Sequence, residues 1–390
     1  MESLFIGAKE ASRSLLVLSD DKRKDVLCRV ADAVEQHMSD ILSANRQDLS
    51  RMDKDNPLYD RLLLNENRVK AIADDMRHVA ALPSPLGLIS KANTLPNGIR
   101  LHRVSVPYGV IGVVYEARPN VTYDVFSLCF KSGNACVLKG GKDAEQSNLT
   151  AVSIIAQVLE QVGIDPRSIT LLPATHEATE AMLTAVGYVD VCIPRGSRRL
   201  IDFVRDHARI PVIETGAGVV HIYFDKDGDL EKGKRIVENA KTRRVSVCNA
   251  LDCLVVHKDR EKDLQALLAP MTDRVAFHYG DYGKEWMSYD LSIKVVDSLD
   301  EAIDFIGKHT SGHSESIITE NEAAARRFEN EVDAACIYWN LPTSFTDGGQ
   351  FGLGAEIGIS TQKMGPRGPM GLEEITTYKW IVEGNGQVRP

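Results

Sequence analysis

Cys248 stands in a setting that could make it a nucleophile. It lies in the segment NAKTRRVSVCNALD, where Lys241, Arg243 and Arg244 precede it by a few residues. Nearby cations favour the thiolate form of a cysteine, which is the form that attacks an electrophile. A cysteine between small apolar residues is also typical of a plain buried position. The segment therefore predicts either a covalent catalyst or an inert core residue.

Two glycine turns could bind the phosphates and hydroxyls of a nucleotide. The run ACVLKGGK ends in Lys139 and Lys142, which flank two glycines after an apolar strand. In IPRGSRRLI, Gly196 and Ser197 stand between a strand and a helix, where backbone N–H groups can face a pyrophosphate. Solvated lysines, a simple turn and an ordinary helix N-cap are the alternative interpretations.

Further polar residues could contact a substrate. Asn120, in YEARPNVTYD, could donate its amide to a developing oxyanion, and Glu214, in VIETGAG, could act as a base or contact a cofactor. An asparagine in a turn and a carboxylate in a solvated loop are the ordinary alternatives. A phosphate or carboxylate group of a substrate would be held by strong charge-assisted hydrogen bonds. The candidates for that role are Arg118, Lys241, Arg243 and Arg244.

The elements expected around these residues alternate between strand and helix. Residues 8–79 show helical periodicity, and residues 82–106 contain prolines, a Pro-Asn-Gly turn and the alternating run IRLHRVSV, which predicts a hairpin strand. From residue 110 onward apolar runs alternate with helical segments, and a second such series begins near Val219. This rhythm predicts parallel sheets covered on both faces, with ligands at the carboxyl ends of the strands. Two α/β lobes separated by a cleft are expected.

Composition narrows the class of protein. A chain of 390 residues exceeds one compact core and predicts two or three units. The net charge is -9 and basic residues are dispersed, so nucleic acid is not expected as a partner. No apolar run approaches the roughly 20 residues of a membrane span, and a cytoplasmic protein without a membrane segment is expected. The 7 cysteines lack paired spacing, which disfavours a disulfide scaffold and a metal site.

Taken together, these segments resemble the aldehyde dehydrogenase superfamily. Its members carry, in order, an oxyanion asparagine, a cofactor lysine, a Gly-Ser helix start, a Glu-x-Gly strand end and a nucleophilic cysteine. The matching residues here are Asn120, Lys139, Gly196, Ser197, Glu214 and Cys248. A closer resemblance, to the gamma-glutamyl phosphate reductase family, rests on long motifs such as VPYGVIGVVYEARPNVT, NAKTRRVSVCNALD and FTDGGQFGLGAEIGISTQK.

The resemblance implies an aldehyde dehydrogenase-like α/β fold with three parts. A Rossmann-type NADPH-binding domain would comprise residues 1–84 and 107–216, and an α/β catalytic domain carrying the nucleophile would comprise residues 217–365. Residues 85–106 and 366–390 would form small oligomerisation β-arms, so a homo-oligomer is expected.

The resemblance also implies a reaction. In this family L-glutamyl 5-phosphate is reduced by NADPH to L-glutamate 5-semialdehyde, with release of phosphate, in proline biosynthesis; the intermediate would be a thioester on Cys248. Lys142 stands where NAD-preferring relatives commonly carry a glutamate, which predicts NADPH. Cofactor contacts are expected from Lys139, Lys142, Gly196, Ser197, Glu214 and Glu356. Glutamate 5-kinase is a candidate partner. The alternatives are another semialdehyde dehydrogenase, using water or coenzyme A, and a non-catalytic scaffold that binds glutamate kinase.

The chain departs from the family pattern in three places. Val245 replaces a usual proline, Arg243 replaces a common glutamine, and LPTSFTDGG has Leu341, Pro342 and Ser344 where ASTRFTDGG is typical. The missing arginine is at position 344. If the missing arginine binds substrate in the family, substrate affinity or choice would differ in this chain, and Arg243 could compensate.

Overall fold

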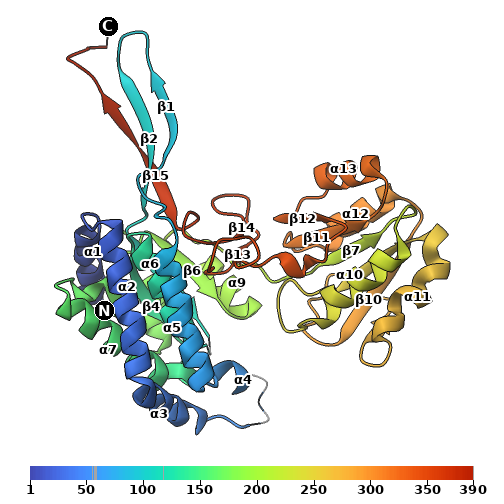
Figure 1. The fold of residues 1–390 in the computed structure, drawn as a ribbon, viewed down its shortest axis with the longest axis horizontal. Coiled ribbons are helices and arrows are strands. Elements are labelled where there is room, and N and C mark those ends of the chain that lie inside the picture. Colours follow the sequence, from blue (N-terminus) through green and yellow to red (C-terminus); the bar gives the residue numbers. More distant parts are fainter. Residues whose placement is uncertain (55, 57–58, 117, 390) are drawn as a thin grey trace. The chain divides into compact units, whose positions relative to one another are not determined.

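The computed structural model describes residues 1–54, 56, 59–116 and 118–389. The chain divides into two compact units, drawn in Figure 1. The first unit comprises Met1–Ile213, Leu353–Ile357 and Met370–Pro390, and the second comprises Glu214–Gly352 and Gly358–Pro369. Within the described residues no helix has the length and apolar character needed to span a bilayer.

The first unit is built from an all-helical opening followed by alternating strands and helices. Its helices and short 3-10 turns are α1 (Glu2–Leu15), α2 (Asp20–Gln36), α3 (Met38–Leu49), α4 (Tyr59–Leu62), α5 (Glu66–Ala81), α6 (Asn120–Lys131), η1 (Lys142–Ala144), α7 (Glu145–Gln161), η2 (Pro166–Ser168), α8 (His176–Leu183) and α9 (Arg198–His207). Its strands are β1 (Ile89–Thr94), β2 (Arg100–Pro107), β3 (Val110–Tyr115), β4 (Ala135–Lys139), β5 (Ile169–Leu171), β6 (Val191–Arg195) and β15 (Thr376–Glu383).

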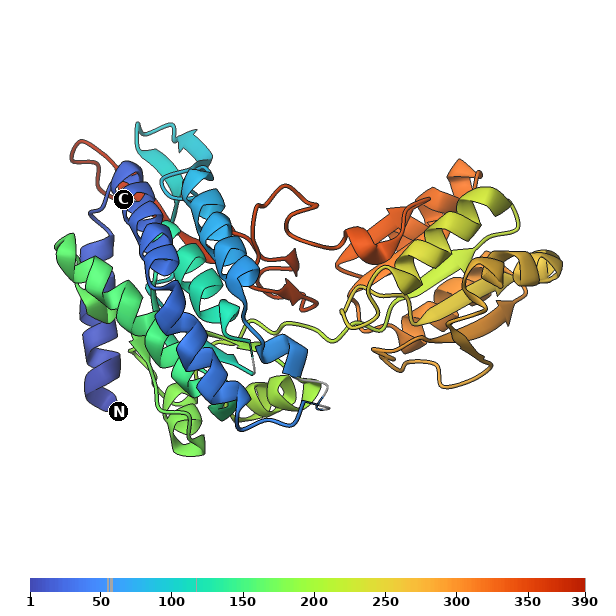
Figure 2. The ribbon, with the colours of Figure 1, turned by 60° about the horizontal axis from the view of Figure 1, so that its bottom comes forward.

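A four-stranded parallel sheet, in the order β5-β4-β3-β6, forms the centre of the first unit. The strand β3 has the sequence VIGVVY, and every one of its residues is buried, as expected for a parallel strand covered on both faces. The blue N-terminal helices lie beside the green helices α6 and α7 in Figures 1 and 2. Lys139 and Arg195 end β4 and β6, so polar residues gather at one edge of this sheet.

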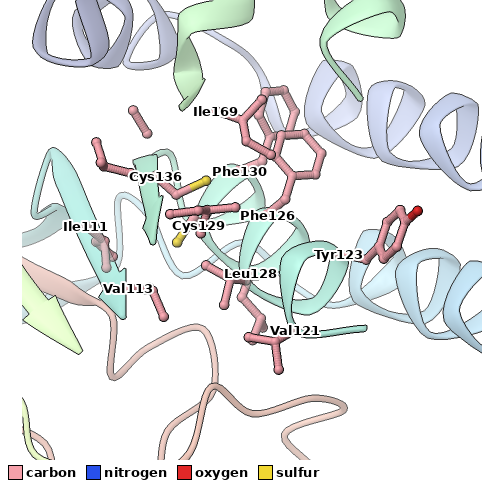
Figure 3. Packing of buried hydrophobic residues seen from close by; sticks show 14 of the residues in the cluster. Ile111, Val113, Val121, Tyr123, Phe126, Leu128, Cys129, Phe130, Cys136 and Ile169 are labelled. Atoms are coloured by element: carbon pink, nitrogen blue, oxygen red, sulfur yellow. The ribbon is translucent and has the colours of Figure 1, made fainter. Parts of the chain in front are cut away.

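Two of the cysteines lie in the apolar core of this unit. Figure 3 shows Phe126, Cys129 and Phe130 of α6 close to Cys136 of β4 and Ile169 of β5. All five side chains are buried, and the rings of Phe126 and Phe130 stack with their centroids 5.3 Å apart. Cys129 and Cys136 therefore act as small apolar core residues.

A three-stranded antiparallel ribbon, in the order β1-β2-β15, projects from the first unit (Figure 1). The hairpin strand predicted for IRLHRVSV is confirmed as β2, which pairs along its whole length with the C-terminal strand β15. Tyr378 and Trp380 on β15 are 55% and 50% exposed.

The second unit is a six-stranded parallel sheet, in the order β12-β11-β7-β8-β10-β9. Its strands are β7 (His221–Phe224), β8 (Cys253–His257), β9 (Ala276–His278), β10 (Asp290–Val296), β11 (Ser314–Ile318) and β12 (Cys336–Trp339). The strands β13 (Ile359–Ser360) and β14 (Gly368–Pro369) follow in the chain and form a separate two-stranded sheet. Its helices and turns are α10 (Leu230–Thr242), η3 (Lys258–Asp263), α11 (Leu264–Leu268), η4 (Ala269–Met271), α12 (Leu299–His309), α13 (Glu322–Glu331) and η5 (Thr343–Phe345).

Two apolar clusters cover the two faces of this second sheet. Val237 of α10 and Leu267 of α11 belong to one cluster, whereas Ile306 of α12 and Phe328 of α13 belong to the other. Successive strand residues divide between the clusters, because neighbouring side chains of a strand point to opposite faces. The predicted parallel architecture with helices on both faces is thereby confirmed.

The unit boundaries differ in detail from the boundaries that the sequence suggests. The first unit ends at Ile213 rather than at residue 216, and the segment Leu353–Ile357 returns to it. Ile357 is fully buried, and its N–H donates to the carbonyl of Met370 at 2.9 Å. This segment carries Glu356, which therefore belongs with the sheet of the first unit.

Candidate active site

Cys248 lies on the segment that joins α10 to β8, and its side chain is half-buried. Hydrogen bonds hold this segment on both sides of the cysteine. Lys241 donates from Nζ to the carbonyl of Leu251 at 2.9 Å, and the side chain of Asn249 donates to the carbonyl of Thr346 at 2.9 Å. The hydroxyl of Thr343 in turn donates to the carbonyl of Asn249 at 2.9 Å. The residue after the cysteine is therefore tied to the segment that follows β12.

Gly218 packs directly against the backbone of Cys248. A Cβ atom at position 218 would lie 1.5 Å from the carbonyl oxygen of Cys248, far inside van der Waals contact. The N–H of Gly218 donates to Oε1 of Glu285 at 3.0 Å, which fixes the glycine at this place. Only a residue without a side chain permits this approach, so Gly218 sets the position of the cysteine backbone.

Two buried ionisable groups flank the Cys248 segment. The side chain of Lys241 is 0% exposed, and burial lowers its pKa to about 8. Burial raises the pKa of Asp252 to about 7, although this carboxylate accepts hydrogen bonds from the N–H groups of Trp286 and Val220. The ammonium group of Lys241 is directed at a backbone carbonyl, and its predicted contact with substrate stays a prediction. Arg243 and Arg244, by contrast, are exposed.

Asn120 is the first residue of α6, and its amide is already oriented by a neighbour. Its Nδ2 donates to Oδ2 of Asp124, one helical turn along, at 2.9 Å. Burial raises the pKa of Asp124 to about 6, while the charge of Arg195 opposes this increase. An amide held in this way keeps its second N–H for another acceptor. Asp124 was not among the residues expected at the site, although the spacing of four in NVTYD is a readable signal.

The helix start at Gly196 and Ser197 binds an anion within the protein itself. The N–H of Ser197 donates to Glu116 at 2.7 Å, and its hydroxyl donates to the same carboxylate at 3.0 Å. The hydroxyl of Ser197 also accepts from the N–H of Leu200, which confirms the helix N-cap interpretation. A Cβ at position 196 would lie 2.6 Å from the Glu116 carboxylate, so Gly196 leaves room for it. This helix terminus is able to hold a negative charge.

Lys139 belongs to the same group at the edge of the first sheet. Burial lowers the pKa of its ammonium group, and the charge of Glu116 acts in the opposite direction. A cavity of about 360 Å³ lies near the carboxyl ends of β4 and β5, lined in part by Gly141, Leu172 and Pro173. Lys142, which follows Gly140 and Gly141, is exposed. This mostly apolar hollow, which the start of α7 at Glu145 also lines, fits the flat base of a nucleotide.

Three predicted residues remain, and each has a neighbour in the described structure. Glu214 is half-buried at the start of the second unit, where its N–H donates to Oε1 of Gln362 at 3.0 Å. Arg118 is half-buried and lies near Asp124. The carbonyl of Glu356 accepts from Arg195 at 3.4 Å, within the first unit. The predicted roles of these residues stay predictions.

The fold agrees with what comparison to known proteins shows. Residues 2–283 match the sequence model of the aldehyde dehydrogenase family. The chain belongs to the aldehyde dehydrogenase family, and the predicted fold class is confirmed.

Individual relatives carry a more specific name. The chain is 54% identical to a gamma-glutamyl phosphate reductase of Bacteroides thetaiotaomicron, covering 100% of this chain and 99% of the relative. It is 53% identical to a protein of the same name from Pelodictyon phaeoclathratiforme, with 99% and 98% covered. Among solved structures, gamma-glutamyl phosphate reductase from Thermotoga maritima superposes with a TM-score of 0.97 at 38% identity, covering 100% of this chain and 99% of that one.

A more distant likeness shows only the fold. An acetylating aldehyde dehydrogenase from Geobacillus thermoglucosidasius is 15% identical, with a TM-score of 0.73 and 100% of this chain covered.

Proposed function

We propose that this chain reduces L-glutamyl 5-phosphate to L-glutamate 5-semialdehyde with NADPH, releasing phosphate, as a cytoplasmic enzyme of proline biosynthesis. The observation that carries the proposal is the 54% identity, over the whole chain, to relatives named for this reaction. Acyl transfer needs a nucleophile and an amide that can stabilise an oxyanion, and the chain supplies Cys248 in the second unit and the oriented Asn120 amide in the first.

Cys248 starts the proposed reaction as a thiolate that attacks the acyl carbon. The oxyanion that forms accepts hydrogen bonds from the Asn120 amide and from the backbone N–H of Cys248. The C–O bond to phosphate then breaks, and phosphate leaves with the bonding electron pair, so that a thioester remains on Cys248. When bound, NADPH supplies the hydride that reduces this thioester. The thiohemiacetal on Cys248 collapses to the aldehyde, and the sulfur becomes free for the next turnover.

The residues that would hold the cofactor lie mostly in the first unit. Lys139 and Lys142 would meet the ribose and its phosphate, and the start of α9 at Gly196 and Ser197 would meet the pyrophosphate. Glu214 and Glu356 would supply further contacts to the cofactor. The bound Glu116 carboxylate supports the fit, because it occupies N–H and O–H donors that a phosphate oxygen could use equally well.

Replacing Glu116 by glutamine is expected to strengthen NADPH binding. The change removes a negative charge beside Lys139 and the α9 N-terminus, where a phosphate would otherwise compete with it. We expect the dissociation constant of NADPH, measured by fluorescence titration, to fall by about threefold to tenfold. Glu160→Gln, on the exposed end of α7, is the matched control. Weaker binding in the Glu116 variant would instead make Glu116 a cofactor ligand.

Replacing Lys142 by glutamate is expected to reverse the cofactor preference. A cation at this place favours the 2′-phosphate of NADPH, whereas a carboxylate repels it and suits the free hydroxyls of NADH. We expect kcat/KM with NADPH to fall by about 10-fold to 100-fold and kcat/KM with NADH to rise. Equal efficiency with both cofactors, unchanged by the substitution, would refute the assignment of Lys142.

Replacing Asp124 by asparagine is expected to increase stability and decrease activity. The folded pKa of about 6 lies above the usual value of about 4, so the folded state holds this proton more tightly than the unfolded state. As pH rises from about 4 to about 6, Asp124 therefore lowers the free energy of unfolding, and the full loss is present above about pH 6. The variant removes this loss but weakens the hydrogen bond that orients Asn120.

The Asp124 variant is tested by thermal unfolding and kinetics together. We expect Tm to rise at pH 8 by on the order of 3 °C and the difference from wild type to shrink toward pH 4.5. The value of kcat should fall by about threefold to tenfold while the dissociation constant of NADPH is unchanged. A Tm difference that is the same at both pH values would contradict the assigned role of the carboxylate.

The proposed reaction is tested most simply in reverse. NADP+ reduction with glutamate 5-semialdehyde should require inorganic phosphate. Turnover with water or coenzyme A in place of phosphate would favour another semialdehyde dehydrogenase, and tight NADPH binding without any turnover would favour the scaffold.

The ribbon is proposed as the surface through which copies of this chain associate. The exposed side chains Tyr378, Trp380 and Val382 of β15 support this proposal. Light scattering of the purified protein measures the number of chains. Glutamate 5-kinase stays a candidate partner.

A further inference from the structure

A cationic cavity lies beside α10 in the second unit. Its volume is about 590 Å³, within the range of small-ligand sites. One wall is the helix α10, and the other is the segment from Asn340 to Phe345 after β12. A second hollow of about 380 Å³ shares Arg235, Asn239 and Arg243 with the first. The cavity and this hollow thus share one face of α10.

The cations of this cavity follow from the helical repeat. Lys232, Arg235, Asn239 and Arg243 are spaced by three or four residues and so share one face of α10. Lys232 is neutralised by Glu320 at 2.8 Å. Among the residues that the structure describes, neither Arg235 nor Arg243 forms an ion pair with a carboxylate. Glu238 lines the adjoining hollow but pairs with Arg274 at 2.8 Å, and Asp229 is near enough to interact with the charge of Arg235. Two guanidinium groups without an ion pair of their own in the described structure therefore line the cavity, which predicts an anionic ligand.

The cavity is joined to the nucleophile segment by hydrogen bonds. The hydroxyl of Ser344, in the cavity wall, donates to Oδ1 of Asn239 at 2.7 Å. The segment that follows Ser344 binds Asn249, the residue after Cys248, through the carbonyl of Thr346. Arg243 is also at the C-terminal end of α10, which leads directly to Cys248. An anion bound here would thus be held on the same framework that holds the cysteine.

Arginine side chains are long, so Arg235 and Arg243 can both reach one anion that lies between them, on the side of Arg243 away from Cys248. Arg235 precedes Arg243 by two helical turns, or about 12 Å along the axis, on the side away from Cys248. The phosphate of an acyl phosphate is attached to the reacting carbon, whereas the α-carboxylate lies at the far end of the molecule. Leu341 and Phe345, 45% and 39% exposed, offer apolar contact for methylene groups. The arrangement fits a carboxylate at the remote end better than the leaving phosphate.

We infer that Arg235 and Arg243 bind the α-carboxylate of the substrate in this cavity, and so select an α-amino acid chain over a simple aldehyde. This inference rests on the proposed function, because that reaction supplies the substrate. It assigns a substrate contact to Arg235, which no sequence motif singled out. Arg243 was a candidate for binding either the phosphate or the carboxylate of the substrate, and the inference assigns it to the carboxylate.

The test uses the reverse reaction with two aldehydes. Glutamate 5-semialdehyde carries the α-carboxylate, and 4-aminobutanal is the same chain without it. We expect Arg243→Gln and Arg235→Gln each to raise KM for glutamate 5-semialdehyde by about 10-fold and to change kcat by less than about threefold. The values of KM for phosphate and kcat/KM for 4-aminobutanal should stay unchanged. Arg326→Gln, on the exposed face of α13, is the matched control.

Each other outcome overturns the inference. A rise in KM for phosphate would assign the guanidinium groups to the leaving group, and equal losses with both aldehydes would make their role structural. If the wild type requires phosphate and the variants keep its KM for glutamate 5-semialdehyde, the inference alone is refuted. If the wild type does not use phosphate, the proposed function is refuted. Arg243→Lys retains the charge and should recover part of the affinity. Thermal unfolding identifies any variant that fails to fold.

Discussion

Replacing Cys248 by alanine is expected to lower kcat by about 10⁴-fold or more, since the variant can form no thioester. The side chain is half-buried, and the backbone on both sides is held by Lys241, Asn249 and Gly218 rather than by the sulfur. Loss of the thiol should therefore leave the fold intact. We expect the NADPH dissociation constant and Tm to match wild type.

The control for this variant is the same chemical change at another cysteine. Cys28 is half-buried in α2 of the first unit. Cys28→Ala should keep full activity, and alkylation by iodoacetamide should inactivate Cys28→Ala and wild type alike. A Cys248→Ala enzyme with more than about one hundredth of wild-type kcat would show that the reaction does not pass through this sulfur.

Replacing Gly218 by alanine is expected to be the most damaging small substitution. Its Cβ would overlap the carbonyl oxygen of Cys248, so either the segment before β7 or the cysteine backbone must move. Such overpacking costs about 1–3 kcal/mol and occasionally more, and here the displaced atoms belong to the nucleophile. We expect lower Tm, a fall in kcat of at least about 100-fold and a changed rate of Cys248 alkylation.

Gly307→Ala is the matched control for this substitution. Gly307 lies in α12 of the same unit, and no neighbouring atom would lie within 4 Å of an added Cβ. Alanine in a helix is favoured over glycine by about 0.5–1 kcal/mol, so this variant should be as stable as wild type or more stable. If Gly218→Ala had the same Tm and kcat as Gly307→Ala, the close approach of Gly218 to Cys248 would be contradicted.

The sequence predicts those features that depend on local pattern. Runs such as VIGVVY and CLVVH are continuous apolar strands, and the glycine turn after Lys139 lies at a strand end as expected. The four-residue strand β12, CIYW, was not among the predicted strands. The helix N-cap at Ser197 is likewise a local property of the residues around it.

Features that depend on distant contacts could not be read in this way. Ser197 and Glu116 are 81 residues apart, and nothing in either segment alone indicates their hydrogen bonds. The close approach of Gly218 to Cys248 also joins separate segments of the chain. Lys241 was expected at the substrate because it is charged; its burial against a backbone carbonyl could not be read from its type, and its contact with substrate stays a prediction. Sequence gives the residue type, whereas burial and partners decide what that residue can do.

The central claim, a thioester on Cys248 that only phosphate releases, is tested by a single-turnover measurement. Wild type is mixed with glutamate 5-semialdehyde and NADP+ without phosphate, and NADPH absorbance is followed. We predict a burst of about one NADPH per active site that then stops, sustained turnover once phosphate is added, and no burst in Cys248→Ala. Sustained NADPH formation without phosphate, or the absence of a burst in a wild type that turns over with phosphate, would contradict the account.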